Sequence, residues 1–167
     1  MTAVVSLRTW RDDDYQLLEE CNTVAMTAHL GGPESPAALK DRHRRYVDNV
    51  DPGGMFVVVL ANGDAIGSIG YWEHSEADWT VWETGWAVIP DHQGKGVASK
   101  AIQAVVKLAS AEGTHRTLHA YPAVDNAGSN ALCRKTGFSL LGPRSFEYPK
   151  GHWMTCNDWS LNLAPSS

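Results

Sequence analysis

The sequence has few cysteines, no long apolar run and no excess of positive charge. Its three cysteines, Cys21, Cys133 and Cys156, are odd in number and irregularly spaced, which fits neither a disulfide framework nor a zinc site. No apolar run is long enough to span a membrane, and the first residues lack the apolar core of a signal peptide. We therefore expect a reduced, cytoplasmic protein that holds no metal and does not bind membranes.

Charge and length limit the partners and the number of domains. The 19 Asp and Glu residues outnumber the 14 Lys and Arg residues, and the formal net charge is −5. This balance disfavours nonspecific nucleic-acid binding and is compatible with a cationic substrate. The 167 residues, 43% of them hydrophobic, fit a single domain over residues 1–167. A homodimer is left open.

Turn-forming residues and apolar spacing predict an alternation of strands and helices. Asn62 and Gly63 join two β-rich runs, which indicates a hairpin. The expected strands are residues 3–9, two runs within 54–72, then 79–90, 115–121, 138–143 and 152–163. The expected helices are residues 10–25, 35–50, 96–111 and 126–138. The order β-α-α-β-β-β-α-β-α-β-β indicates an α/β fold with a mixed central sheet and a central β-α-β unit.

The third expected helix has one apolar stripe and begins at a glycine turn. The stripe consists of Val97, Ala101, Val105, Leu108 and Ala109. Backbone N–H groups at a helix start have no partner within the helix, and the helix dipole makes this end partly positive.

Gly94, Lys95 and Gly96 form the turn itself, and glycines let a ligand approach the backbone closely. The turn therefore indicates a phosphate site, with a plain strand-to-helix turn as the alternative. Neither a P-loop nor a dinucleotide fingerprint fits, because Ile89 and Ser99 stand where those motifs need glycine.

Two longer motifs occur in order along the chain. The first reads V-x-P followed by Q-x-x-G-x-A, at Val88, Pro90, Gln93, Gly96 and Ala98. The second reads N-x-x-S…G-F, at Asn126, Ser129, Gly137 and Phe138. Together they resemble the GNAT superfamily of acyl-CoA-dependent N-acetyltransferases. The stretches "ETGWAVIP" (83–90) and "NDWSLNL" (157–163) are most similar to the RimJ/RimL-like branch of that family.

The resemblance implies a GNAT fold with helices on both faces of the sheet. It implies acetyl-CoA as cosubstrate and direct transfer of the acetyl group to a primary amine in a ternary complex. The amine belongs to a small molecule or to a protein N-terminus. By the resemblance, the residues that bind the cosubstrate are Trp86, Val88, Gln93, Gly94, Lys95, Gly96, Val97, Ala98, Asn126 and Ser129. A noncatalytic acyl-CoA-binding module and a nucleotide-dependent oxidoreductase are the alternatives.

The reaction needs a base, because an amine attacks only when it is neutral and its ordinary pKa lies at about 8 to 10.4. Glu83 is the first candidate, since it lies beside Trp82 and Trp86 and aromatic surroundings would raise the pKa of its carboxyl. His119 is the second candidate, and Tyr121 lies on the same face of that strand. An ordered water relay is the third.

The family also supplies a backbone N–H near Val88 for the developing oxyanion. Two positions depart from the family pattern. Cys133 stands where many members carry a tyrosine that protonates the leaving thiolate, and Lys100 lies near a position that is often acidic in the RimL-like branch.

Overall fold

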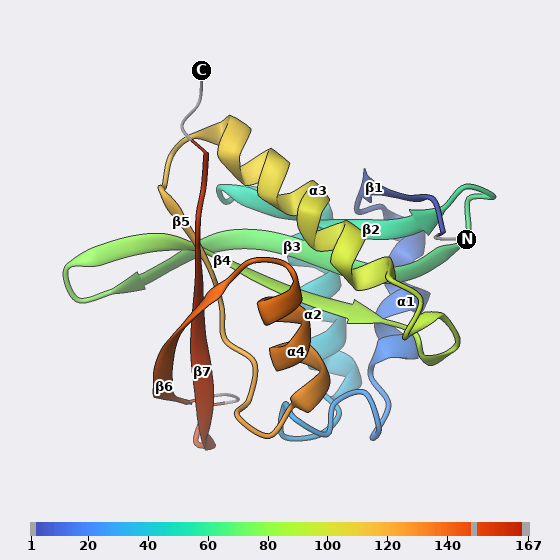
Figure 1. Ribbon diagram of the computed structural model, residues 1–167. Helices are drawn as coiled ribbons and strands as arrows, with labels where there is room; N and C mark the ends of the chain where they lie inside the picture. Colours follow the sequence, from blue (N-terminus) through green and yellow to red (C-terminus); the bar gives the residue numbers. More distant parts are fainter. Residues whose placement is uncertain (1–2, 148–149, 165–167) are drawn as a thin grey trace.

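The computed structural model describes residues 3–147 and 150–164, and its elements follow the order expected from the sequence. The strands are β1 (Val5–Thr9), β2 (Gly53–Leu60), β3 (Ala65–Glu76), β4 (Trp79–Val88), β5 (Thr117–Ala120), β6 (Ser139–Glu147) and β7 (Trp153–Asn162). The helices are α1 (Tyr15–Cys21), α2 (Pro36–Asp48), α3 (Val97–Glu112) and α4 (Ala127–Lys135). Figure 1 shows α3 and α4 in front of the sheet and α1 and α2 behind it.

The strands form one sheet in the order β1-β2-β3-β4-β5-β7-β6. Neighbouring strands are antiparallel except β4 and β5, which are parallel and are joined by the crossover through α3. The predicted hairpin between β2 and β3 is confirmed. Gly63 has φ 91° there, and the Asn62 side chain accepts a hydrogen bond from the Asp64 backbone N–H.

Two apolar clusters hold the helices against the sheet. On the front face, α3 packs on strand residues such as Ile69, Trp82 and Leu118, all of which are fully buried. The predicted stripe of α3 is right in four positions, but Leu108 is 39% exposed at its margin. Ile102, which the predicted stripe did not include, is buried. Each buried side chain of this size contributes roughly 1.5 to 3 kcal/mol relative to an exposed one.

On the back face, the helices cover only part of the sheet. Leu17 and Leu18 of α1 and Leu39 of α2 pack against Val57 and Val59 of β2. These helices therefore lie over the β1–β3 end of the sheet. The same face from β3 to β6 carries polar side chains instead, as described below.

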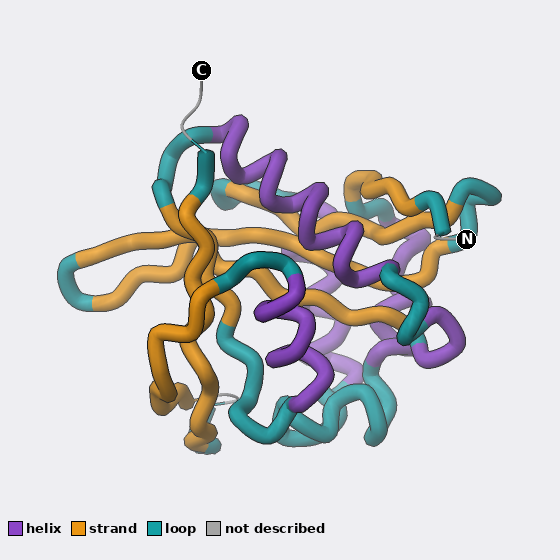
Figure 2. Tube along the Cα trace, in the orientation of Figure 1, coloured by secondary structure: helices purple, strands orange, loops and turns teal. Residues whose placement is uncertain are grey.

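Helix α1 ends at Cys21, four residues before the expected end at residue 25. The reason is Asn22, whose side chain donates to the Glu34 carbonyl and accepts from the Glu34 N–H at 2.9 and 2.8 Å. These two bonds close residues 22–34 into a loop. Figure 2 shows this loop beside the one that leads into α4, and His29 Nδ1 lies 3.0 Å from Asp125 Oδ1 there.

Candidate active site

Strands β4 and β5 part from each other in the middle of the sheet. Their register pairs end with Thr84 and Ala120, whereas β4 continues to Val88 along β3. The Ile89 N–H donates to the carbonyl of Ile66 in β3. Because successive backbone N–H groups of a strand point to opposite edges, the Val88 N–H points to the edge that β5 has left. The structure thus leaves backbone groups of residues 85–88 open to a ligand.

A cavity of about 1030 Å³ opens on the back face at this gap. Its lining includes Trp86 of β4, Tyr121 after β5, Asn126 and Ser129 of the α4 start, and residues of α2. Gly85 and Trp72 also line the cavity, and a Cβ at Gly85 would lie only 3.0 Å from Cη2 of Trp72. Of the expected cosubstrate residues of β4 and α4, Trp86, Asn126 and Ser129 therefore lie around one cavity, whereas Val88 is buried and does not line it.

The glycine turn precedes α3 at the end of β4, beside the gap. Gly94 and Gly96 have φ values of 71° and 80°, a left-handed backbone that favours glycine. Gln93 is tied to the strand, since its Nε2 donates to the Val88 carbonyl at 2.7 Å. Lys95 Nζ donates to the Asp91 carbonyl at 2.9 Å and is exposed. The first helical bond of α3 runs from Lys100 N to Gly96 O, so the N–H groups of Val97 and Ala98 are not used within α3.

Helix α4 begins at Asn126, as expected. The Asn126 side chain accepts from the Ser129 N–H at 3.1 Å and caps the helix. Asn130, which the sequence reasoning missed, links α4 to β7. Its Oδ1 accepts from Asn157 Nδ2 and Trp159 Nε1, both at 2.8 Å. The cap and this link fix the end of α4 that faces the cavity.

Glu83 lines the cavity, and its side chain is 22% exposed. Burial raises the pKa of this carboxyl to about 7, while the nearby His74 and Trp72 side chains act to lower it. The expected cause of the shift was wrong in part. Trp82 belongs to the front-face cluster, and alternation along β4 turns Trp82 and Trp86 away from Glu83.

His119 and Tyr121 share a face with Glu83, as the register pair Glu83 and His119 requires. His119 is buried, lies outside the cavity lining and has its Nδ1 2.7 Å from Asp158 Oδ1. Tyr121 lines the cavity, and its hydroxyl is buried with no hydrogen-bond partner among the residues that the structure describes. Burial raises the pKa of this phenol, which keeps it protonated. The two rings stack at 5.8 Å.

The two departures from the family pattern lie away from the cavity. Cys133 is completely buried in the front-face cluster, and burial raises the pKa of its thiol to about 12. Lys100 Nζ donates to the Ala3 carbonyl at the other end of the sheet. Neither side chain is placed to take part in chemistry at the cavity.

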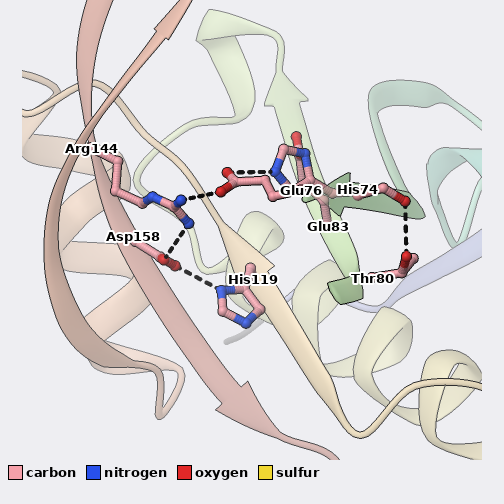
Figure 3. Close-up of polar contacts among 8 residues, drawn as sticks. His74, Glu76, Thr80, Glu83, His119, Arg144 and Asp158 are labelled. Atoms are coloured by element: carbon pink, nitrogen blue, oxygen red, sulfur yellow. Dashed lines mark hydrogen bonds and ion pairs between the residues drawn. The ribbon is translucent and has the colours of Figure 1, made fainter. Parts of the chain in front are cut away.

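Figure 3 shows a residue that the sequence reasoning missed, His74 of β3, between Glu76 and Glu83. The expected strand ended at residue 72, whereas β3 continues to Glu76, and this extension carries His74. Among residues 3–147 and 150–164, no group of three or more His, Cys, Asp or Glu side chains could hold a metal ion. In the same part of the chain, we find no helix with the length and apolar character that a membrane crossing requires.

Known proteins share this fold and sequence pattern. The model of the acetyltransferase (GNAT) domain family matches residues 5–139. An L-methionine sulfoximine/L-methionine sulfone acetyltransferase from Pseudomonas aeruginosa is 30% identical over 137 residues, which cover 80% of this chain and 79% of that protein.

Solved structures agree in fold. The spermidine N-acetyltransferase from Vibrio cholerae in complex with CoA and spermine has a TM-score of 0.78 at 20% identity, with 95% of each chain covered. An acetyltransferase from Salmonella typhimurium that modifies the N-terminal serine of the 50S ribosomal subunit protein L7/L12 has a TM-score of 0.77 at 19% identity. The match covers 98% of this chain and 97% of that one.

The chain belongs to the GNAT acetyltransferase family. It is an acetyl-CoA-dependent N-acetyltransferase, and the expected fold class is confirmed. Membership of this family does not support the two alternatives, the noncatalytic module and the oxidoreductase.

Proposed function

We propose that the protein acetylates the primary amine of a small zwitterionic acceptor by direct attack in a ternary complex, with Glu83 as the base. The observation that carries the proposal is the position of the Glu83 carboxyl on the cavity wall, beside the gap between β4 and β5. A carboxyl whose pKa lies at about 7 is ionised in part at neutral pH and can accept a proton there.

Acetyl-CoA supplies the activated acetyl group and a thiolate that leaves readily. The residues that would hold it are the N–H groups from Gln93 to Ala98, Trp86 and Val88 beside the gap, and Asn126 with Ser129 on α4. The left-handed glycines and the unused N–H groups of the α3 start fit an anionic pyrophosphate. The Val88 N–H is the donor that we assign to the developing oxyanion.

Acetylation of an ammonium group releases one proton overall, because the nitrogen loses two protons and the thiolate takes up one. Glu83 is the acceptor that we assign to the proton lost before attack. Tyr121 is the donor that we assign to the thiolate, because its buried hydroxyl has no partner among the described residues. It regains a proton from the attacking nitrogen, which loses its second proton as the tetrahedral intermediate collapses. His119 then supports Tyr121 by stacking and does not accept the proton.

Charges on two walls of the cavity support this acceptor class. Glu83 lies on the sheet, and Arg45 lies in the last turn of α2. An acceptor with an ammonium group and a carboxylate would meet one opposite charge on each wall. The Pseudomonas aeruginosa relative acts on L-methionine sulfoximine and L-methionine sulfone, which are acceptors of this kind.

A thiol-release assay with acetyl-CoA tests this proposal. The acceptors are L-methionine sulfoximine, its carboxamide, spermidine and a peptide with an N-terminal serine. The proposal predicts the highest kcat/KM for the free amino acid and a loss of about tenfold or more for the carboxamide. Arg45→Ala should remove this difference, whereas Arg44→Ala, an exposed neighbour outside the lining, should keep it. Equal rates with amino acid and carboxamide, or preference for the peptide, would contradict the zwitterionic acceptor.

Several expectations stay predictions. They are the RimJ/RimL-like branch, the homodimer, the absence of a metal, the lack of nucleic-acid and membrane binding, and the cytoplasmic location. The single domain over residues 1–167 is also one, since residues 1–2, 148–149 and 165–167 lie outside the described part of the chain.

A further inference from the structure

His74 lies between two carboxylates on the back face of the sheet. Its Nδ1 is 3.2 Å from Oε1 of Glu83, and its Nε2 is 3.1 Å from Oε1 of Glu76. Figure 3 shows Glu76 between Arg144 of β6 and the His74 ring, with Glu83 close to that ring. Both ring nitrogens of His74 are therefore engaged by acids, and one of these acids is the proposed base.

The register of β3 and β4 produces this arrangement. Trp72 pairs with Glu83, so His74, two residues further along β3, has its side chain on the same face and lies diagonally opposite the glutamate. Aromatic rings hold the imidazole in place. The ring centroids of Trp79, Tyr121 and Phe146 lie 6.0, 5.1 and 5.9 Å from it. Its side chain is 21% exposed.

The hydrogen-bond partners of His74 determine which of its ring nitrogens carries a proton. Glu76 forms an ion pair with Arg144, and its contacts with His74 and Arg144 outweigh burial and lower the pKa of its carboxyl. An ionised carboxylate only accepts hydrogen bonds, so Nε2 of His74 carries the proton that faces Glu76. The ring nitrogen Nδ1 and the Glu83 oxygen then have one proton to share.

We propose that His74 and Glu83 act together as the base, so that the proton removed from the acceptor amine is held between Nδ1 of His74 and Oε1 of Glu83. The inference rests on the proposed role of Glu83. In the step, the N–H bond of the ammonium group breaks and a bond forms to the Glu83 oxygen or, by transfer, to Nδ1. The proton leaves to water at the partly exposed edge of the pair when the cycle ends. His74 is a positioning residue in this account, because it acts on the amine through Glu83.

Other titratable groups surround the pair from every neighbouring strand. They are Glu76 on β3, His119 on β5, Tyr121 after it, Arg144 on β6, and Cys156 and Asp158 on β7. Arg42 and Arg45 of α2 line the cavity across from them. Arg144 lies 3.5 Å from Asp158 and bonds Glu76, so these two acids share its single positive charge. The charge that acts directly on Glu83 at hydrogen-bond range is therefore that of His74.

Two substitutions of His74 separate its charge from its hydrogen bond. His74→Asn places an amide N–H near the position of Nδ1 but has no charge, and His74→Leu removes both. Because His74 and Glu83 share the titrating proton in this pair, both variants should shift the acidic limb of kcat/KM away from its wild-type position. His74→Leu should also reduce kcat by about tenfold, and His74→Asn by less, because only the asparagine can orient the carboxylate.

His115→Gln is the matched control. Nε2 of His115 lies 2.8 Å from Oε1 of Glu73, which precedes His74 on β3. His115 itself does not line the cavity. Its removal should leave the acidic limb in place. A second readout does not depend on turnover. In ¹⁵N NMR of the free protein, Glu83→Gln should change the signal of Nδ1 of His74, which faces Glu83, more than that of Nε2, which faces Glu76.

The outcomes separate this inference from the proposal on which it rests. If Glu83→Gln abolishes the acidic limb and His74→Asn moves it, both stand. If Glu83→Gln abolishes the limb but neither His74 variant moves it, His74 is structural and the shared base is wrong. If Glu83→Gln leaves the limb unchanged, the assignment of the base itself fails. An Nδ1 signal of His74 that is the same in wild type and in Glu83→Gln would also overturn the inference.

Discussion

His119 and Asp158 face each other across the pairing of β5 and β7, with 2.7 Å between Nδ1 and Oδ1. The other ring nitrogen of His119 lies 3.4 Å from the Ser160 hydroxyl, and both members of the pair are buried. A histidine with both nitrogens engaged beneath the cavity wall serves to hold the strands together. This geometry favours Glu83 over His119 as the base.

His119→Gln should therefore lower stability and spare the base. The loss of a buried charge-assisted hydrogen bond should reduce the free energy of unfolding by about 1 to 3 kcal/mol, measured by urea denaturation. The acidic limb of kcat/KM should stay in place. Disappearance of that limb in the variant would exchange the roles of His119 and Glu83.

Gly96→Val tests the phosphate-binding turn. A valine at φ 80° is strained and its side chain covers the N–H groups at the start of α3, so CoA affinity should fall at least about tenfold. Gly63→Val is the matched control, because Gly63 has φ 91° and equally open space in a turn far from α3. Calorimetry with CoA should find the control unchanged. Equal affinities of the two variants would argue against the turn as the phosphate site.

Asn126→Ala tests whether the cap of α4 also contacts the cosubstrate. Loss of the cap should cost about 1 kcal/mol of stability, and CoA binding should weaken in addition. Ser35→Ala removes an equivalent cap, since the Ser35 hydroxyl accepts from the Ala38 N–H at 3.2 Å on α2. That control should lose stability without losing affinity. If both variants bind CoA normally, Asn126 has only a structural role.

The raised pKa of Glu83 also predicts how stability depends on pH. Its carboxyl titrates at about 7 in the folded protein and near 4.5 ordinarily, so the folded state is favoured below that ordinary value. This advantage is lost as the pH rises through about 7. Glu83→Gln removes the cost of ionisation and should stabilise the protein at pH 8.5 by on the order of 1–3 kcal/mol. At pH 4 the two proteins should be alike, as measured by urea denaturation. A variant less stable than wild type at pH 8.5 would contradict this environment of Glu83.

Local signals in the sequence predicted most of the fold. Asn62 and Gly63, Ser35 and Asn126 each carried the turn or cap that their residue type favours, and the order of elements followed. The end of α1 was missed because Asn22 bonds to Glu34, a contact across a loop that local propensity does not contain. Leu108 was misplaced because the stripe of α3 extends beyond the surface that the sheet covers.

The sequence predicted those site residues whose position depends on a single strand, and it missed those whose position depends on how two strands pair. The position of Glu83 on β4 follows from the motif that it precedes. The neighbour His74 depends on the register of β3 and β4, which their hairpin at Ala77 and Asp78 sets. That turn has no glycine, and Ala77 takes φ 20°, so sequence alone did not give the register. Trp82 faces away from Glu83 for a local reason, because adjacent residues of β4 alternate between the two faces of the sheet.

The pH profile of kcat/KM for Glu83→Gln, measured with a small amino-acid acceptor, tests the central claim most directly. Wild type should show an acidic limb with a midpoint near pH 7, because the base must be ionised before it can accept a proton. Glu83→Gln keeps the shape of the side chain, so turnover should fall by about 10²-fold, the limb should vanish and CoA affinity should be unchanged. A variant that retains both the limb and the wild-type turnover would show that Glu83 is not the base.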